Sequence, residues 1–288
     1  MKKKLKNIAG VTLIEILIGI VISTIMMGAM FTSYNAVNSV FQQVTDKAKI
    51  SQSGRDIVGM LLKDIRLAGF KYFGDSLKTS DLHQPILISK SADFSKNCDQ
   101  IEIVYGDVDY DEAKAEGLRY TYTRYKVTYA CGRSEIINKK IPGGKTTIDA
   151  FYIVKSKIKW DAATNAWADP NTDSDDTTYP KEKIIDYVQD LIFNAIDENG
   201  KIISPPPSTS NNKDKIYKIK NVEIALTVRS TQEFFQNSRI RKVFSLSDSK
   251  RDIGAKNDKY LRDTIIVTAY ARNLGLQWII EKTKKDLL

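Results

Sequence analysis

The sequence is poor in the residues on which most enzyme sites depend. Its 288 residues include one histidine, His83, and two cysteines. Without a second histidine, His83 offers neither a catalytic triad nor a metal cluster, and its place before Gln84-Pro85 favours a loop with a surface or packing role. The motifs GxSxG, GxxxxGK[ST] and HExxH are absent. We therefore expect no enzyme activity, no cofactor, no bound metal and no small-molecule substrate.

Charge is nearly missing from residues 7–45. Between Lys6 and Asp46 the only formally charged residue is Glu15. An apolar run from Val11 to about Phe31 supplies roughly 20 residues, the length that crosses a bilayer as a helix. A carboxylate inside such a segment costs about 3 kcal/mol on insertion scales. The position of Glu15 near the start of the span therefore indicates a partner that offsets this cost.

The residues around Glu15 resemble the class III leader of type IV pilins and pseudopilins. That family has a short basic leader, a glycine, and an apolar helix with glutamate at its fifth position. Here residues 1–10 form the leader with its four lysines, and Val11 departs from the usual phenylalanine. The resemblance implies cleavage between Gly10 and Val11 by a prepilin peptidase, followed by methylation of the Val11 amine. It also implies that Glu15 pairs with the first amine of a neighbouring subunit, which would keep the acid ionised in low dielectric.

Two simpler interpretations of the N-terminus stay open. A secretory signal peptide has an apolar core of about 7 to 15 residues that ends in small residues, whereas this run is longer and contains Glu15. A single-pass anchor fits the length, and its lysines would stay cytoplasmic. An anchor gives no reason for Glu15, so the carboxylate favours the pilin-like interpretation.

The helical pattern continues beyond the apolar run. Apolar residues recur every three or four positions as far as Ala68, and Gly69 is a predicted stop. We predict one helix from Val11 to Ala68, about 85 Å long at 1.5 Å per residue. Its predicted parts are a transmembrane half, residues 11–31, and an amphipathic half, residues 32–69.

The end of this predicted helix resembles a narrower group of proteins. Residues 64–70, Asp-Ile-Arg-Leu-Ala-Gly-Phe, are similar to the helix end of PilW-type minor pilins and, more distantly, of J-type minor pseudopilins of type II secretion. Residues 187–200 and 270–273 also resemble PilW-type proteins. Asp64 and Arg66 cannot face each other on a helix, so we expect each to cap or pair with the head domain separately. A solvated helix face is the alternative for both.

Residues 70–288 show the period-two pattern of a β-rich head domain. Strands are predicted over residues 100–105, 119–130, 148–154, 184–196, 222–228 and 265–271. Tyrosines change face near Arg124, which indicates a β-bulge, and Asn199-Gly200 is a hairpin signal. The last two strands are predicted to be antiparallel with one buried face. The predicted fold class is α+β, a long N-terminal helical spine packed on an antiparallel sheet.

Loops and cysteines complete the predicted head domain. Residues 161–180, 204–215 and 236–258 have the composition of loops. An exported domain with an even, low cysteine count favours a disulfide between Cys98 and Cys131. The two lie 33 positions apart, and a loop of that size closed by a disulfide adds about 3 kcal/mol of stability. Two buried thiols are the alternative.

Charged clusters in the head have simple explanations. The acids of residues 107–112 and 169–176 suggest a calcium loop, but Glu112 stands where glycine is needed and Leu118 replaces the bidentate glutamate. We therefore expect solvated loops. The basic segment 234–259 contains aromatic residues and could bind DNA phosphates, although a loop with inward aromatics is the simpler alternative. The net charge of +9 includes four leader lysines, and a remainder of about +5 is weak support for nucleic acid or acidic lipid.

The resemblance implies a minor pilin of the PilW type. Such a subunit spans the inner membrane once with a periplasmic head, is cut by prepilin peptidase, and joins other minor and major pilins. It primes pilus assembly and takes a place at the pilus tip on the cell surface. A J-type minor pseudopilin of a type II secretion system is the close alternative. An adhesin or DNA-receptor tip subunit, whose head binds a host surface or DNA, is the second.

Overall fold

The structure, a computed structural model, describes most of the chain. The described residues are 10–70, 84–91, 98–137, 147–161, 163–173, 176–207, 215, 218–235, 237–241, 246 and 256–274. The leader residues 1–9 and His83, for which the sequence made predictions, lie outside these ranges. Residues 1–48 and 49–288 form two compact units.

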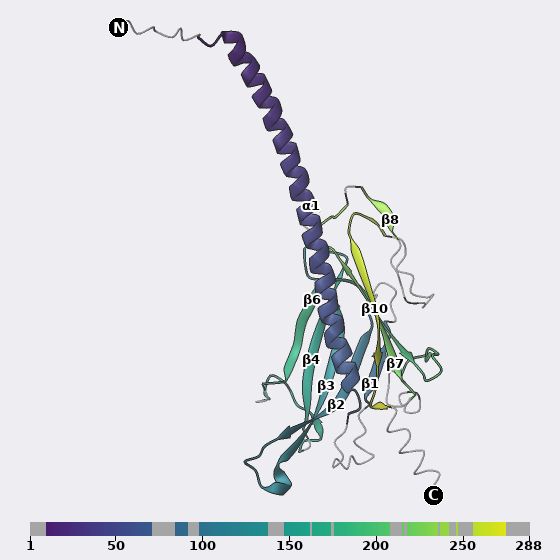
Figure 1. The fold of residues 1–288 in the computed structure, drawn as a ribbon. Coiled ribbons are helices and arrows are strands. Elements are labelled where there is room, and N and C mark those ends of the chain that lie inside the picture. Colours follow the sequence, from purple (N-terminus) through teal and green to yellow (C-terminus); the bar gives the residue numbers. More distant parts are fainter. Residues whose placement is uncertain are drawn as a thin grey trace. The chain divides into compact units, whose positions relative to one another are not determined.

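Helix α1, Leu13–Leu67, is 55 residues long (Figure 1). It contains no proline, so no residue within it lacks the N–H that an internal helical turn requires. Gly69 follows its last turn with a φ of +72°, which glycine adopts without a Cβ clash. The N–H of Gly69 donates to the carbonyl of Val104 at 2.9 Å. The predicted long helix and its stop at Gly69 are confirmed.

The second unit is built on an antiparallel sheet of eight strands. The order is β1-β2-β3-β4-β6-β7-β10, and β5 pairs with β4. The strands are β1 (Ile86–Ser89), β2 (Gln100–Tyr110), β3 (Tyr120–Arg133), β4 (Phe151–Asp161), β5 (Ala166–Trp167), β6 (Tyr179–Ile196), β7 (Asn221–Arg229) and β10 (Arg262–Tyr270). A separate pair is formed by β8 (Arg239–Arg241) and β9 (Lys256–Asp258). The predicted α+β fold class is confirmed.

The core lies between the C-terminal part of α1 and one face of this sheet. The helix contributes a buried stripe at the spacing of its turns, which includes Ile57, Leu61 and Ile65. Gly54 extends this stripe, and a Cβ at that position would lie 2.7 Å from Cδ1 of Ile265 on β10. The missing side chain therefore allows a close approach between helix and sheet.

Strand β6 connects two parts of the sheet. Its first half pairs with β4 as far as Val188, and its second half pairs with β7 from Val188 to Ile196. Irregular register separates the halves, and Tyr187 has a φ of +61° there. The segment before β2 meets the second half of β6, because Cys98 forms a parallel bridge with Leu191. The sheet is thus curled, with the start of β2 next to β6.

The hairpin of β2 and β3 extends beyond its neighbouring strands (Figure 1). The two strands stay paired up to Tyr110 and Tyr120, whereas the pairing of β3 with β4 begins only at Tyr125. We call residues 107–123 the arm. A short 3-10 helix, η2 (Glu116–Leu118), lies at its tip.

Several local predictions need correction. The register of β2 and β3 is continuous through Arg124, so the predicted bulge is wrong. Side chains of a regular strand alternate between the two faces of the sheet, and the tyrosines of the arm fall on the face opposite to those further along β3. On that face the Tyr122 ring covers Gly106. Residues 161–180 and 236–258 are not wholly loops, since they contain β5, the start of β6, β8 and β9. Strand β7 is buried on both faces near its end.

Candidate functional site

The start of α1 holds the carboxylate that the sequence singled out. Thr12 precedes the first helical residue, and Glu15 is the third residue of the helix. Glu15 Oε2 accepts two hydrogen bonds of 2.8 Å, one from the Thr12 backbone N–H and one from the Thr12 hydroxyl. This arrangement is that of a capping box, in which an acid at the third position reaches back to the N-cap residue.

The cap gives Glu15 a role inside its own chain that the sequence analysis missed. The signal was available, because Thr12-Leu13-Ile14-Glu15 has the T-x-x-E spacing of a capping box. Only one carboxylate oxygen is used. Within the described residues, Oε1 of Glu15 accepts no hydrogen bond. The carboxylate therefore has room for a second donor from outside the chain.

The predicted cleavage point lies immediately before this cap. Gly10 and Val11 are exposed and precede the helix, outside regular secondary structure. Val11 is 73% exposed, and a Cβ at Gly10 would meet nothing within 4 Å. Both residues that flank the predicted cleavage point are therefore exposed in the described chain.

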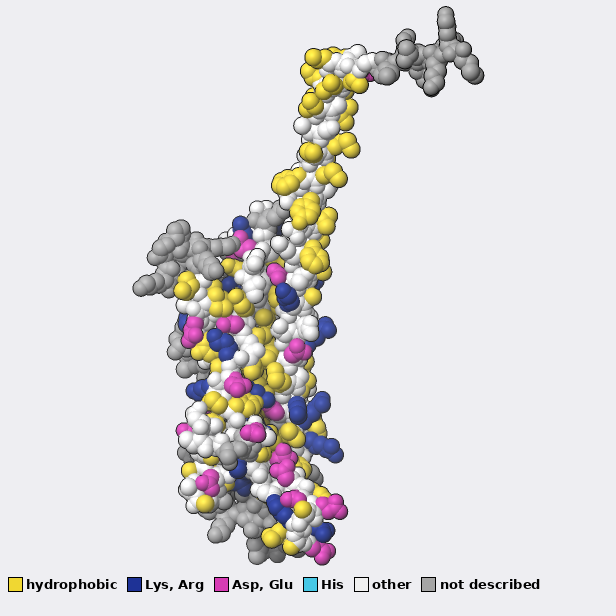
Figure 2. All heavy atoms as spheres, turned by 90° about the vertical axis from the view of Figure 1, so that its left-hand side faces the viewer, with side chains coloured by type: hydrophobic (Ala, Val, Ile, Leu, Met, Phe, Trp, Pro, Cys, Tyr) yellow, Lys and Arg dark blue, Asp and Glu magenta, His cyan; other side chains and the backbone are white. Residues whose placement is uncertain are grey.

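The N-terminal part of α1 exposes apolar side chains almost continuously, which Figure 2 shows as yellow groups. Among the described helices, α1 is long and apolar enough to cross a membrane, by length and composition. Several of its hydroxyl groups donate hydrogen bonds to carbonyls of the same helix. Ser23 donates to the Gly19 carbonyl at 2.7 Å, and Thr32 donates to Ala29 at 2.9 Å. Such bonds are what a lipid environment requires, because lipid offers no partner for a polar group.

At the other end of α1, Asp64 connects the helix to the sheet. Its Oδ2 accepts a 2.6 Å hydrogen bond from the Tyr129 hydroxyl and lies 2.9 Å from Lys155 Nζ. Asp64 is buried, and its partners come from β3 and β4. The predicted pairing of Asp64 with the head is confirmed. Arg66 is exposed and its side chain has no partner among the described residues, so the solvated alternative holds for it.

The protonation of this buried cluster follows from its surroundings. Burial raises the pKa of Tyr129, and the charge of Asp64 and the hydrogen bond to it raise it further. Burial alone would lower the pKa of Lys155, but the hydrogen bond and charge of Asp64 outweigh it, so the net shift is upward. Lys155 therefore remains a cation and Tyr129 a neutral donor throughout the physiological pH range.

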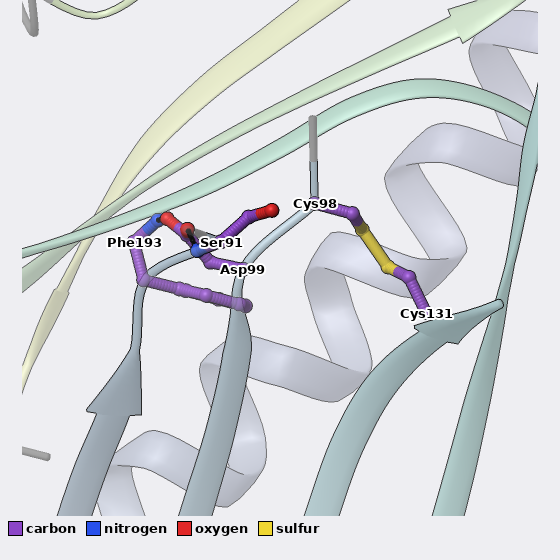
Figure 3. The surroundings of a disulfide bond; sticks show 5 residues. All are labelled: Ser91, Cys98, Asp99, Cys131 and Phe193. Carbon is purple, nitrogen blue, oxygen red and sulfur yellow. Dashed lines mark hydrogen bonds between the residues drawn. A yellow bond between two sulfur atoms is a disulfide. The ribbon is translucent and has the colours of Figure 1, made fainter. Parts of the chain in front are cut away.

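A disulfide joins Cys98 and Cys131 beside the junction of β2 and β6 (Figure 3). The Cα atoms lie 6.1 Å apart, within the usual range for disulfides. The neighbouring Asp99 is fully buried and accepts hydrogen bonds from the backbone N–H groups of Ser91 and Phe193, at 3.1 and 3.0 Å. Lys90 Nζ lies 3.1 Å from the same carboxylate. Asp99 and the disulfide thus hold the curled sheet at one point, and no sequence signal pointed to Asp99.

The predicted cleavage point, the capped carboxylate and the exposed apolar helix thus lie in one N-terminal segment. Residues 5–31 match the prokaryotic N-terminal methylation motif. The methylation motif is the class III leader of type IV pilins, so the chain is pilin-like in its leader. A comparison with curated proteins found no match. Among solved structures, the chain is similar to the type IV-like pilin TTHA1219 from Thermus thermophilus, with a TM-score of 0.45, 10% identity, and coverage of 78% of this chain and 96% of that chain.

The predicted acidic loops and the predicted basic segment are only partly described by the structure. Asp107 and Asp109 lie on strand β2 rather than in a loop. No group of three or more His, Cys, Asp or Glu residues that could hold a metal occurs among the described residues. In the basic segment, Lys259 pairs with Glu233 at 3.7 Å. Part of that positive charge is therefore neutralised locally.

Proposed function

We propose that the chain is a minor pilin of the PilW type, which primes the assembly of a type IV pilus and takes a place at its tip. The leader motif supports membership of the pilin-like proteins, and the residues around Asp64 carry the resemblance to the PilW type. Function then depends on the helix, which passes from the membrane into the filament. Other minor and major pilins are its proposed partners.

One observation carries this proposal. Glu15 is the only charged residue in an exposed apolar segment, and its own helix satisfies only one of its two carboxylate oxygens. In an apolar filament core, the first amine of a neighbouring subunit would meet the free oxygen. An opposite charge at that distance offsets the burial cost of the acid. A plain membrane anchor would have no use for this second site.

Processing and orientation follow from the same segment. We propose that the prepilin peptidase cuts between Gly10 and Val11 and that the Val11 amine is methylated. The leader lysines keep the N-terminus on the cytoplasmic side of the inner membrane. The head domain then lies in the periplasm until assembly moves it to the cell surface.

Replacement of Glu15 tests the proposal. Glu15→Leu leaves a neighbour's amine without a partner in low dielectric, a loss of about 3 to 5 kcal/mol. We expect normal cleavage and normal amounts of membrane-inserted protein. Co-purification with the other pilin subunits should fall by about tenfold or more, and pili should be lost.

Thr12→Val is the matched control. It removes the hydroxyl donor of the cap and costs about 1 kcal/mol of helix stability, but leaves the carboxylate available to a neighbour. Its co-purification should stay close to the wild-type level. Equal recovery of Glu15→Leu and wild-type protein, with normal piliation, would reduce Glu15 to a helix cap in an ordinary anchor. Loss of protein secretion with intact pili would instead assign the chain to a secretion system.

A further inference from the structure

The outward face of α1 within the second unit carries an excess of positive charge. Arg55, Lys63 and Arg66 follow one another at helical spacing and are exposed, and we call them the basic stripe. None of the three side chains has an ion pair among the described residues. Asp56 is the one acid that the described residues place on this face. Gly59 lies between the cations, and a Cβ there would meet nothing within 4 Å.

The arm has the opposite charge. It contains five acids and two basic residues. The acids are Asp107, Asp109, Asp111, Glu112 and Glu116, and the basic residues are Lys114 and Arg119. All five acids are exposed. The single ion pair that the described arm makes is internal, between Lys114 and Asp111 at 3.7 Å.

The arm is also built to reach beyond the sheet. Its two strands have no third strand beside them among the described residues. Two-stranded ribbons are marginally stable alone, yet this one is held by cross-strand contacts such as the Tyr110–Tyr120 ring pair, with centroids 5.2 Å apart. The ribbon thus presents its acids away from the core. Within the described chain, no ion pair joins the arm to the basic stripe.

We propose that the basic stripe of one copy binds the acidic arm of a second copy. The charges are complementary, both surfaces are exposed, and neither surface is neutralised by the other within one chain. Because the two surfaces are different, the contact is head-to-tail, and it leaves a free stripe at one end and a free arm at the other. The contact is weak and salt-dependent, as exposed ion pairs are. It goes beyond the proposed function, since a priming complex built this way contains at least two copies of the chain.

The test uses full-length copies with two different tags, each copy embedded alone in its own neutral-lipid nanodisc. This arrangement prevents contact between the membrane segments. The stripe variant is Arg55→Glu/Lys63→Glu/Arg66→Glu, and the arm variant is Asp109→Lys/Asp111→Lys/Glu112→Lys. Capture of one tag by the other is measured at low and at high salt.

We expect wild-type copies to capture each other at low salt and to separate at high salt. When both copies carry the stripe variant, capture should fall by about tenfold, and the same loss is expected when both copies carry the arm variant. A copy with the stripe variant mixed with a copy with the arm variant should recover capture. In this mixed pair each stripe again faces an arm of opposite charge. Lys181→Glu/Lys201→Glu/Lys218→Glu changes the net charge by the same amount as the stripe variant, at exposed sites elsewhere, and should capture as wild type does.

Two outcomes would overturn the proposal. Either capture is unchanged by both charge reversals, or the mixed pair fails to recover while both variants show wild-type unfolding curves. Binding of a single wild-type copy to empty anionic nanodiscs, lost in the stripe variant, would assign the stripe to a lipid surface instead. All variants keep Gly10 and Glu15, so a failure here is separate from a failure of the proposed assembly role.

Discussion

At the scale of single residues, Asp64 shows how a helix carboxylate can be buried without a large penalty. It has a cation at 2.9 Å and a phenol donor at 2.6 Å. Removal of one partner from such a cluster leaves an uncompensated buried charge, which costs about 3 to 5 kcal/mol. The cluster therefore fixes the position of the helix along the sheet. The surrounding apolar contacts are less directional and would allow the helix to shift more easily.

The protonation of Tyr129 gives a test at this scale. Its pKa is raised above the ordinary value of 10.0 by burial and by Asp64. Above about pH 10 the unfolded chain releases the phenol proton and the folded chain keeps it, so the free energy of unfolding falls as pH rises. Tyr129→Phe removes the contribution of this phenol to the pH dependence of the free energy of unfolding. We expect its stability to decline by about 1 kcal/mol less than wild type between pH 10 and pH 11, measured by urea unfolding with tryptophan fluorescence.

Tyr120→Phe is the control for that experiment, because Tyr120 is 55% exposed on the arm. Its decline should parallel that of the wild type. At neutral pH, Tyr129→Phe should also be less stable by about 1 to 3 kcal/mol, since Asp64 loses a donor. Identical pH dependence in wild type and Tyr129→Phe would mean that the phenol is not shielded in the folded chain.

At the scale of elements, the disulfide acts on the sheet rather than on a loop. Cys131 is near the end of β3, and Cys98 lies on the segment that bridges to Leu191 of β6. Reduction should therefore loosen the junction between β2 and β6, where Asp99 is buried.

The disulfide prediction is tested on the full-length protein. Mass spectrometry without reduction should show a Cys98–Cys131 peptide, and two freely alkylated thiols under native oxidising conditions would refute it. Cys98→Ala/Cys131→Ala should lower the free energy of unfolding by about 3 kcal/mol, because the unfolded chain regains the freedom of a 33-residue loop. Reduced wild-type protein is the matched comparison and should lose a similar amount.

Elements with regular periodicity were predictable from the sequence, whereas contacts between distant segments were not. The spacing of apolar residues predicted α1 and the stop at Gly69, and alternation predicted the centres of β2, β3, β6, β7 and β10. The buried Asp99 carboxylate accepts hydrogen bonds from the backbone N–H groups of Ser91 and Phe193, and no local sequence pattern identifies these contacts. The cap between Thr12 and Glu15 could be predicted from the sequence, because the T-x-x-E spacing of a capping box is local.

At the scale of the whole molecule, the proposed function requires that the leader be removed before the helix can enter a filament. Gly10 is exposed and precedes the helix start. Gly10→Lys places a long charged side chain where the peptidase site needs a small residue. We expect the full-length precursor to accumulate in the inner membrane, with no subunit in pili.

N-terminal sequencing measures this outcome. Wild-type protein in pili should begin at Val11, and Gly10→Lys protein should retain Met1. Gly10→Ala, with a small side chain, is the control and should be cut. Intact Met1 in wild-type pili would contradict processing at this bond.

The junction between Asp64 and the sheet has a mechanical consequence. Tyr129 belongs to β3 and Lys155 to β4, strands that have partners on both sides. A pull along the C-terminal part of α1 therefore loads interior strands of the sheet instead of peeling an edge strand. The hydrogen bonds of neighbouring strands then share the load and must yield together. A subunit tethered by its helix can in this way bear tension while its head stays folded.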